Sequence, residues 1–445
     1  MKTTQSRLMK IFIGTEEIAG ITTSLCKGFR EIGIDAEVVV AERHRFDYDT
    51  KGQQCLLVRF WMRLIAINNR TSQKQFIRKG IISTAVRLGN FMVLVWSLQK
   101  FDTFVFVFGK TITGTRFELW LIKAIGKRIV FLYLGSDARP PYINGSKYPD
   151  GCAVDLEKAR SLTAKIKRKL KFQEKYGDVC INSPSTAQFH VKPFINWFVL
   201  GLPKHITSCS AHKTNCQSNR KVKIVHSPSN PLAKGSPVIL NSIERLKAKG
   251  LSIELIKIEG MPNSRVLEEI MRCDFVVDQL YSDTPLATLA TEAAHFGKPS
   301  VIGGYFAPVM NDYIHKENIP PSLFVHPNDI EQAIEKLVVD VDFRLELGRR
   351  AQIFVQNNWA PAEVARRFLR VVNGDIPSEW WYDPKDIRYV HGFGIPEVHA
   401  RHIVRSMIDR YGKGSLQVED KPELEKAFLE FAGLNVDFNE KGDRK

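Results

Sequence analysis

The sequence predicts an α/β protein built from two doubly wound domains that face each other across a cleft, and three observations support this. The chain has 445 residues, more than one hydrophobic core usually supports. Short apolar strand patterns alternate with helical patterns, which is typical of parallel sheets. The alternation stops at a polar stretch, residues 204–220, and then restarts, so this stretch is the expected domain boundary.

The first domain is predicted over residues 1–210. It begins with a strand at residues 9–13, a helix at residues 22–32 and a strand at residues 36–40. Two strands joined through a helix pair in parallel, because the helix carries the chain back to the starting edge. β-Branched and aromatic residues predict further strands at residues 103–108, 129–134 and 178–182.

The second domain is predicted over residues 221–375, and residues 376–445 form a C-terminal extension. In that extension, Trp380, Trp381 and Tyr382 are expected to pack the chain back onto the first domain. Ligands of open parallel sheets bind beyond the carboxyl ends of the strands, so the cleft is where chemistry is expected. The predicted strands of the second domain are residues 222–226, 253–258, 275–280 and 300–302, with helices at residues 237–249, 263–273 and 286–296.

Several features predict a cytoplasmic protein. The N-terminus lacks the pattern of a secretory signal. The most apolar stretch, residues 91–108, contains Gln99, Lys100 and Asp102, and it predicts a buried helix followed by a strand rather than a membrane span. Seven scattered cysteines favour a reducing compartment over a disulfide framework.

Cysteine and histidine spacing predicts no metal site. Cys209, His212 and Cys216 lie close together, but their spacing fits no zinc ribbon or finger. A polar linker with unpaired thiols is expected there. A structural role is expected for His391 and the histidines that follow it.

Basic residues are concentrated in the first half of the chain. Residues 1–220 hold 35 Lys and Arg against 16 Asp and Glu, a net +19, whereas residues 221–445 hold 29 against 32, a net −3. Residues 51–100 contain nine basic residues and no acidic one, interleaved with large apolar side chains. A second basic run, residues 158–175, has apolar residues at helical spacing and predicts an amphipathic helix.

These basic runs favour attraction of the first domain to an anionic membrane surface or to a polyanionic acceptor. The alternative is a solvated helix face whose apolar stripe lies in the core. Nucleic acid is not expected as a partner, because the sequence contains no recognised nucleic-acid-binding motif.

Three stretches of the second domain carry a family resemblance. They are residues 224–230 with Lys234-Gly235, residues 273–279, and Thr291-Glu292-Ala293-Ala294 followed by residues 297–299. Together they resemble the family-four retaining glycosyltransferases, and residues 14–20 and 135–139 match more loosely. The resemblance implies the GT-B fold of two Rossmann-like domains, a nucleoside-diphosphate sugar as donor substrate, and no cofactor.

The residue types at these positions suit such a reaction. Transfer of a sugar leaves negative charge on the departing diphosphate, and Lys234 can stabilise that charge. Ala287 and Thr288 open a helix directly after a predicted strand, so its free N–H groups can cradle a phosphate. Gly20 has no side chain and lets the donor approach the first domain's backbone. The resemblance assigns Glu292 to the ribose hydroxyls.

Two positions depart from the family pattern. Thr284 stands where the family has the first of two glutamates, which holds the donor sugar, and Asp283 beside it could substitute. A basic residue expected after the first strand of this domain is also absent. Lys234 would then carry more of the charge, unless Arg139 or Lys298 assists.

Asp137 and Arg139, at the end of predicted strand 129–134, are candidates for acceptor contact, and Asp137 and Lys234 are the predicted catalytic residues. The alternative for Asp137 is a turn cap. No Asp-x-Asp motif stands at a predicted strand end, so catalysis without a divalent ion is predicted. The resemblance implies retention of anomeric configuration.

The leading hypothesis is transfer of a hexose or related sugar to a glycan or lipid-linked acceptor in cell-envelope polysaccharide synthesis. It places the protein in the cytoplasm, peripherally at the inner membrane face. Two alternatives are a sugar-nucleotide epimerase of the same fold, which would need acid and base carboxylates in the cleft, and a catalytically silent binding or scaffold protein, which Thr284 favours.

Overall fold

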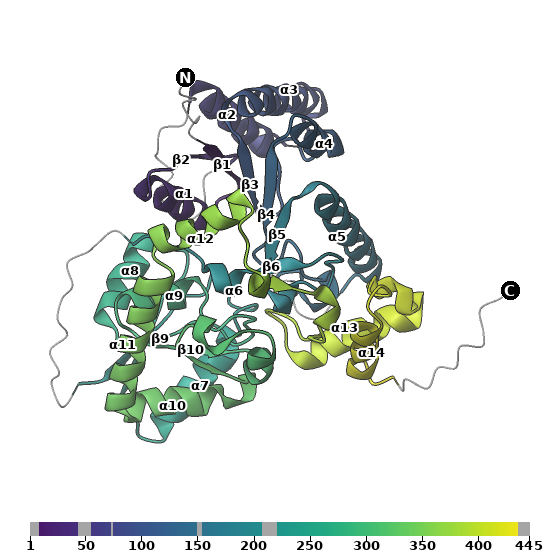
Figure 1. Ribbon diagram of the computed structural model, residues 1–445. Helices are drawn as coiled ribbons and strands as arrows, with labels where there is room; N and C mark the ends of the chain where they lie inside the picture. The colour runs from purple at the N-terminus through teal and green to yellow at the C-terminus, as the bar shows by residue number, and fades with distance from the viewer. Residues whose placement is uncertain (1–8, 43–54, 73, 149–153, 207–219, 435–445) are drawn as a thin grey trace.

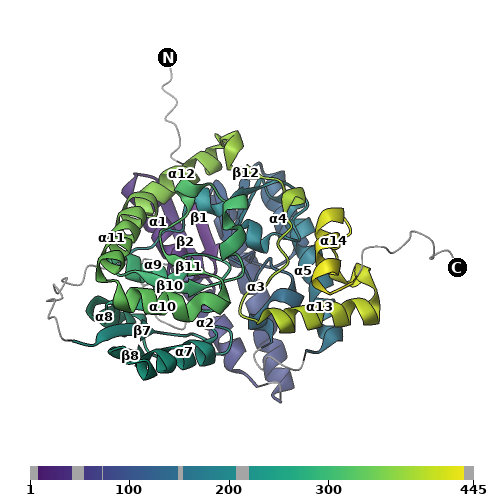
Figure 2. The ribbon, with the colours of Figure 1, turned by 90° about the horizontal axis from the view of Figure 1, so that it is seen from below.

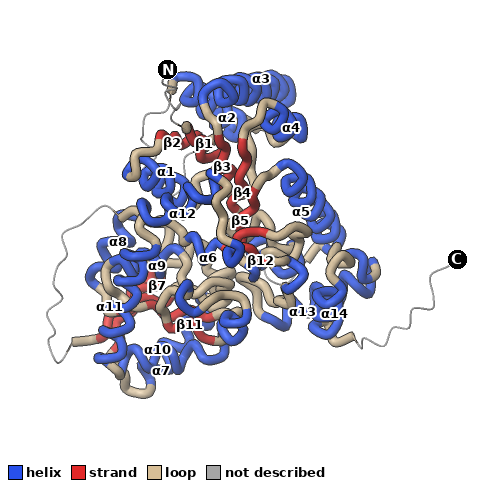
Figure 3. The backbone as a smooth tube through the Cα atoms, viewed as in Figure 1, coloured by secondary structure: helices blue, strands red, loops and turns tan. Residues whose placement is uncertain are grey.

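The structure, a computed structural model, describes residues 9–42, 55–72, 74–148, 154–206 and 220–434. Two α/β domains lie against each other, and the last part of the chain lies on the first domain (Figure 1). Each domain contains one sheet, and Figure 3 shows the two groups of strands apart from each other. The predicted twin-domain architecture, that of the GT-B fold, is confirmed.

The first sheet has seven strands in the order β12-β6-β5-β4-β3-β1-β2. The first six strands in the chain pair in parallel, and β12 joins the edge antiparallel to β6. The direction of winding reverses between β1 and β3, so this is a topological switch point. The strands are β1 (Lys10–Thr15), β2 (Asp35–Val40), β3 (Thr103–Val107), β4 (Arg128–Leu132), β5 (Val179–Asn182), β6 (Phe194–Asn196) and β12 (Trp381–Tyr382).

The second sheet has five parallel strands in the order β11-β10-β9-β7-β8, and its winding reverses between β7 and β9. The strands are β7 (Val222–His226), β8 (Ile253–Lys257), β9 (Phe275–Val277), β10 (Ser300–Gly303) and β11 (Leu323–Val325). The helices of this domain are α7 (Ser236–Ala248), α8 (Asn263–Arg272), α9 (Thr288–His295), α10 (Ile330–Val339) and α11 (Val341–Asn358).

The chain crosses back to the first domain through α12 (Pro361–Asn373), which packs on α1 (Ile21–Glu31). The contact is close because Gly28 lies against Pro361, where a Cβ on Gly28 would fall 2.0 Å from the carbonyl oxygen. α13 (Glu397–Tyr411) and α14 (Pro422–Phe431) then cover the first domain beside α5 (Leu156–Tyr176), as Figures 1 and 2 show. Tyr142 of the first domain holds this extension through Leu416 and Phe428.

The aromatic residues after α12 pack as expected. Trp381 and Tyr382 form β12 against β6, and the ring of Tyr382 lies 5.6 Å from that of Phe194. Trp380 is buried beneath the guanidinium of Arg370. The prediction that this cluster packs the extension onto the first domain is confirmed.

The prediction of a buried helix in residues 91–108 is wrong in two respects. The helix, α3 (Phe76–Lys100), begins much earlier, and it is mostly exposed. It is long and apolar enough to cross a membrane by length and composition alone. It packs beside α2 (Leu56–Arg70), and Trp61 of α2 donates to Asn90 of α3 at 2.6 Å. The first domain also contains α4 (Arg116–Ala124) and α6 (Trp197–Leu200).

Candidate functional site

Two neighbouring cavities lie at the carboxyl ends of the strands, where the domains meet. The C-domain cavity has a volume of about 230 Å³ and lies largely in the second domain. The interdomain cavity has a volume of about 150 Å³ and has walls from both domains. Ile18, Ala19 and Thr288 line both, so the cavities are two parts of one cleft, as expected for switch points that face each other.

Lys234 is fixed at the wall of the C-domain cavity by a turn and an ion pair. Gly235 follows it with a φ of 68° and directly precedes α7. A side chain at that glycine would clash, because its Cβ would lie 2.5 Å from Leu280. The Lys234 ammonium lies 3.0 Å from Oδ1 of Asp278, a fully buried carboxylate. The turn and the carboxylate together hold a cation at the cavity.

The N-terminus of α9 adds partial positive charge to the same cleft. The first N–H groups of a helix have no partner within it, and Ala287, which precedes α9, provides no side-chain cap for them. Thr288 lines both cavities, and Ala287 lines the interdomain cavity. The predicted cradle residues therefore lie beside Lys234, which also lines the C-domain cavity.

Glu292 lies about one turn into α9, with its carboxylate almost fully buried. Its Oε1 accepts from the Lys204 ammonium at 2.7 Å and from the Asn263 amide at 2.9 Å. Lys204 also donates to the carbonyl of Ala19 at 2.8 Å. This places Glu292 at the C-domain cavity with its acceptor oxygen oriented by two side chains.

Lys204 is the residue that the sequence analysis missed. It is the first residue of the polar stretch between the domains and reaches across to Glu292 of the second domain. No motif surrounds it, because its role depends on how two separately folded domains meet. The only sequence signal was its position at the predicted domain boundary.

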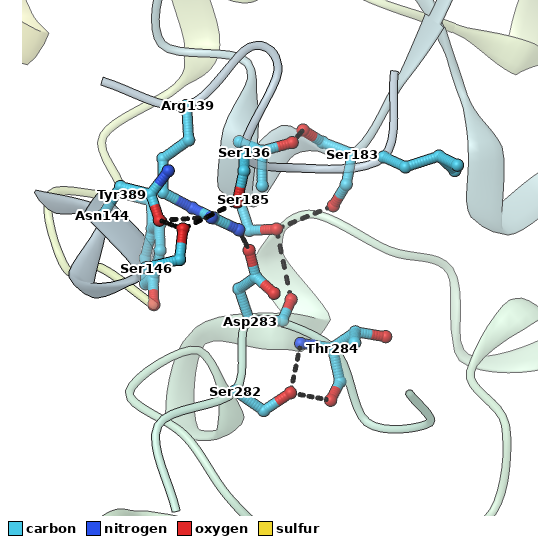
Figure 4. Close-up of polar contacts among 12 residues, drawn as sticks. Ser136, Arg139, Asn144, Ser146, Ser183, Ser185, Ser282, Asp283, Thr284 and Tyr389 are labelled. Atoms are coloured by element: carbon cyan, nitrogen blue, oxygen red, sulfur yellow. Dashed lines mark hydrogen bonds and ion pairs between the residues drawn. The ribbon is translucent and has the colours of Figure 1, made fainter. Parts of the chain in front are cut away.

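Arg139 and Asp283 form a second ion pair across the cleft (Figure 4). Both side chains are buried, and the Arg139 guanidinium also lies 5.0 Å from the ring centre of Phe393. Burial lowers the pKa of Arg139 to about 10, so it stays charged at neutral pH. Asp283 lines the interdomain cavity, but Arg139 engages its carboxylate, the group expected to replace the family glutamate.

Thr284 lies in the wall of the interdomain cavity. Its N–H donates to the Ser282 hydroxyl at 3.2 Å, and that hydroxyl donates to the Thr284 carbonyl at 2.7 Å. Ser185 of the first domain donates to the Asp283 carbonyl at 3.2 Å. The loop between β9 and α9 is thus fixed from within and from the first domain, as Figure 4 shows.

Asp137 lines neither cavity. Its Oδ1 accepts from the N–H of Leu134 at 3.0 Å, which closes a turn after β4. Burial raises its pKa, while the nearby ammonium of Lys169 lowers it. Within the described residues its Oδ2 has no hydrogen-bond partner. These contacts are those of a turn cap, the alternative interpretation that the sequence analysis gave for Asp137.

Gly20 directly precedes α1 with a φ of 82°. The next N–H groups of that helix are already occupied, because the Glu17 carboxylate accepts from Thr22 at 3.3 Å and from Thr23 at 2.9 Å. Burial raises the pKa of Glu17. Near the start of α1, the first domain therefore faces the cavities through Ile18, Ala19 and Ile21 rather than through an open helix terminus.

The described part of the chain contains no group of three or more His, Cys, Asp or Glu residues placed to hold a metal ion. Cys26, Cys55, Cys180 and Cys273 are free thiols. The candidate cluster of Cys209, His212 and Cys216 lies outside the described residues. His391 stacks on Tyr305, with ring centres 5.2 Å apart, in keeping with the structural role expected for it.

No protein-family model and no curated protein sequence matches this chain. Among solved structures it is similar to the catalytic domain of starch synthase IV from Arabidopsis thaliana bound to ADP and acarbose, at 12% identity over 83% of this chain and 99% of that chain, with a TM-score of 0.49. It is also similar to Anabaena HepE in complex with UDP-glucose, at 11% identity over 83% and 100%, with a TM-score of 0.46. A mutant of S. aureus TarM in complex with fondaparinux, alpha-GlcNAc-glycerol and UDP gives 9% identity over 82% and 99%, with a TM-score of 0.46. Similarity this distant does not transfer a ligand or a reaction to this chain.

Proposed function

We propose that this protein is a glycosyltransferase that moves a sugar from a nucleoside-diphosphate sugar to a glycan or lipid-linked acceptor. The observation that carries the proposal is the C-domain cavity. It combines a fixed ammonium, that of Lys234, with the open N-terminus of α9 and the oriented carboxylate of Glu292. A diphosphate needs the first two groups, and a ribose diol needs an acceptor such as the third.

In this arrangement the ribose hydroxyls donate to Glu292, and the diphosphate lies between Lys234 and Thr288. As the bond to the sugar breaks, negative charge develops on the departing phosphate, and the ammonium and the helix terminus stabilise it. Asp278 is a positioning residue, because it holds the Lys234 ammonium 3.0 Å away. The sugar then extends toward the interdomain cavity.

Retention of anomeric configuration and independence from divalent ions complete the proposal. Retention follows from the family resemblance. Independence is supported by the positive charge that Lys234 and α9 already provide for the diphosphate. Excess chelator should leave the transfer rate unchanged within a factor of two, and abolition of the rate that Mg²⁺ restores would contradict this part of the proposal.

A catalytically silent binding protein is the second candidate. It is favoured by one observation: the loop that should hold the donor sugar carries Thr284, and Arg139 engages the neighbouring carboxylate of Asp283. Such a protein would still bind a nucleotide sugar but would not transfer the sugar. The epimerase alternative would convert the donor without any acceptor, so product analysis of the donor separates all three.

Ligand-dependent thermal stability tests the site. A ligand that binds only the folded protein raises its melting temperature, so UDP-, GDP-, ADP- and TDP-sugars are compared at equal concentration. One of them should stabilise the wild type, and Lys234→Met and Glu292→Gln should each lose most of that shift. Lys221→Met, at an exposed lysine outside the cavity, is the matched control. If Lys234→Met and Glu292→Gln retain the full shift, the site is wrong.

The surface of α2 and α3 supports a location at an anionic membrane. Apolar side chains on both helices are exposed, among them Ile77 at 78% and Ile81 at 68%. Arg59, Arg63 and Arg78 are exposed on the same helices, and residues 51–100 contain no acidic residue. Exposed apolar patches of this kind need a partner, and the combination with basic charge suits an anionic lipid surface. We place the protein peripherally at the cytoplasmic membrane face, in cell-envelope polysaccharide synthesis.

Co-sedimentation with phosphatidylglycerol-containing vesicles at low salt tests this surface. Ile77→Glu/Ile81→Glu should reduce the bound fraction by about tenfold, because it removes apolar area that would be buried in the membrane and adds repulsion between the new carboxylates and the anionic lipid. Val339→Glu, at a valine of α10 that is 62% exposed, should leave binding unchanged. Equal binding by the α3 variant and the wild type would remove the membrane part of the proposal.

A further inference from the structure

A third cavity, here the basic cavity, lies in the first domain and takes no part in the site described above. Its volume is about 540 Å³, within the usual range for ligand pockets. It is formed by the loop that follows β3 and by one face of α5. Five cationic side chains line it, namely Lys110, Arg116, Lys165, Arg168 and Lys169.

These cations crowd together with few acidic partners. Lys110 pairs with Glu16, and Lys169 donates to the carbonyl of Asp137 at 3.1 Å. Arg116 lies over the ring of Phe172, 5.0 Å from its centre. Burial lowers the pKa of Lys169, and the neighbouring lysines lower it further while Asp137 raises it. Mutual repulsion of this kind is relieved when an anion binds between the cations.

The loop leaves the recognition of an anion to these side chains. The carboxylate of Glu118 accepts from the N–H groups of Ile112 and Thr113, each at 2.8 Å, and from the hydroxyls of Thr111 and Thr113. Glu118 thus folds the loop from within and does not line the cavity. The ligand groups that remain are guanidinium and ammonium ions, which bind phosphate through charge-assisted hydrogen bonds.

The position of the basic cavity relates it to the cleft. It lies beyond the carboxyl end of β3, on the same edge of the sheet as the loop after β1. Lys110 of the cavity pairs with Glu16 of that loop, and Ile18, two residues further on, lines both cavities of the cleft. A ligand held in the basic cavity therefore lies beside the proposed sugar-transfer site and on the acceptor's domain.

The outer face of α4 indicates what kind of molecule carries the anion. Arg116 lines the basic cavity, whereas Phe117 and Trp120 on the same helix are about half exposed, with ring centres 5.6 Å apart. Exposed aromatic side chains beside basic ones are typical of surfaces that contact the membrane interface. One short helix thus presents a cation to the cavity and two aromatic rings to its surroundings.

We propose that the basic cavity binds the phosphate or diphosphate group of the acceptor, which is therefore a phosphate-bearing, lipid-linked molecule. The identification of the bound molecule as the acceptor rests on the proposed function, but its binding can be measured without any transfer reaction. The phosphate sits among the lysines and arginines, the lipid chain leaves past α4, and the glycan end points to the cleft.

Direct binding to the full-length protein tests the proposal, with farnesyl diphosphate and inorganic pyrophosphate as probes in calorimetry. Lys165→Ala/Arg168→Ala should weaken both by about 10- to 100-fold. Lys158→Ala/Lys171→Ala removes the same charge from exposed positions of the same helix, and it should change either affinity less than twofold. Farnesyl diphosphate should bind more tightly than pyrophosphate to the wild type.

Three other outcomes overturn the proposal. If Lys234→Met abolishes farnesyl diphosphate binding and the cavity pair does not, the diphosphate occupies the C-domain cavity. If the cavity pair weakens adsorption to phosphatidylglycerol vesicles as much as it weakens farnesyl diphosphate binding, the cavity holds bulk phospholipid head groups. If pyrophosphate binds as tightly as farnesyl diphosphate, the lipid-linked acceptor is wrong. These binding measurements do not depend on the nucleotide-sugar stability test. Failure of the proposed function and failure of this proposal are therefore distinguishable.

Discussion

In the described part of the chain, two ion pairs cross the cleft between the domains, and they differ in what surrounds them. In the Arg139–Asp283 pair, Arg139 lies next to Phe393 and lines neither cavity, whereas Asp283 lies in the wall of the interdomain cavity. In the Lys204–Glu292 pair, Lys204 lines the interdomain cavity and Glu292 lines the C-domain cavity, and this carboxylate is a group that the proposed nucleotide needs. The first pair can hold the domains together at all times, whereas the second must accommodate a ligand.

The largest expected effect comes from breaking the Arg139–Asp283 pair, which the proposed nucleotide does not contact. Arg139→Met leaves the buried carboxylate of Asp283 without its cation, and removal of one partner of a buried pair costs about 3–5 kcal/mol. Urea or thermal unfolding should show this loss. Arg139→Met/Asp283→Asn should recover much of it, because it removes the uncompensated charge as well.

Arg350→Met is the matched control for that prediction, since Arg350 is exposed on α11. It should change the unfolding midpoint by less than the error of the measurement. A loss of stability in Arg139→Met no greater than in this control would mean that the pair across the interdomain cavity does not join the domains.

The difference between the two pairs also shows what the sequence could predict. The alternation of strands and helices, and their polar boundary, predicted the two sheets, because each pattern is local and repeats. Lys234, Thr288 and Glu292 follow strands of one sheet at its switch point, so their approach to one cavity was predictable from connectivity alone. Their roles remain predictions.

Contacts between the domains could not be predicted in this way. Lys204 and Glu292 are far apart in the chain, and their meeting depends on the angle at which two complete domains pack. The same holds for Asp283, which was expected to face a sugar but meets Arg139. α3 was expected to be buried because it is apolar, and composition alone does not show that the sheet leaves most of it uncovered.

The second largest expected effect is a loss of nucleotide-sugar affinity when the Lys204–Glu292 pair is broken. Lys204→Met removes the cation that orients Oε1 of Glu292, and it should weaken nucleotide-sugar binding by about tenfold, the equivalent of 1.4 kcal/mol. Isothermal titration with the nucleotide sugar identified by the stability screen measures it. Arg139→Met, assayed well below its melting temperature, should bind the nucleotide with nearly wild-type affinity.

A double variant then separates orientation from simple charge. If Lys204 acts by orienting the carboxylate, Lys204→Met/Glu292→Gln should bind no more weakly than Glu292→Gln alone, because the two losses are one effect. Fully additive losses would show that Lys204 contacts the ligand itself. Tighter binding by Lys204→Met than by the wild type would show that Lys204 competes with the nucleotide for Glu292.

The smallest expected effect is a pH dependence of stability that arises beside the Lys204–Glu292 pair. His295, at the end of α9, has its pKa lowered to about 4 by burial and, secondarily, by the charge of Lys204. Below its usual pKa of 6.5 the unfolded chain binds a proton that the folded chain does not. Stability should therefore fall as the pH decreases from 6.5 toward 4, by up to about 1.4 kcal/mol per pH unit from this group.

Comparison of variants isolates that contribution from the titration of other groups. His295→Gln should reduce the slope of stability against pH between 6.5 and 4, and His315→Gln, at an exposed histidine, should not. Lys204→Met should raise the pH at which the steep region ends on its acidic side, because one charge that lowers the pKa of His295 is gone. Arg139→Met/Asp283→Asn, which removes both charges of the other pair, should leave the slope unchanged, since the pKa of Arg139, about 10, lies far above this range. A change of slope in that variant would mean that the two ion pairs are coupled and that the cleft opens and closes as one unit.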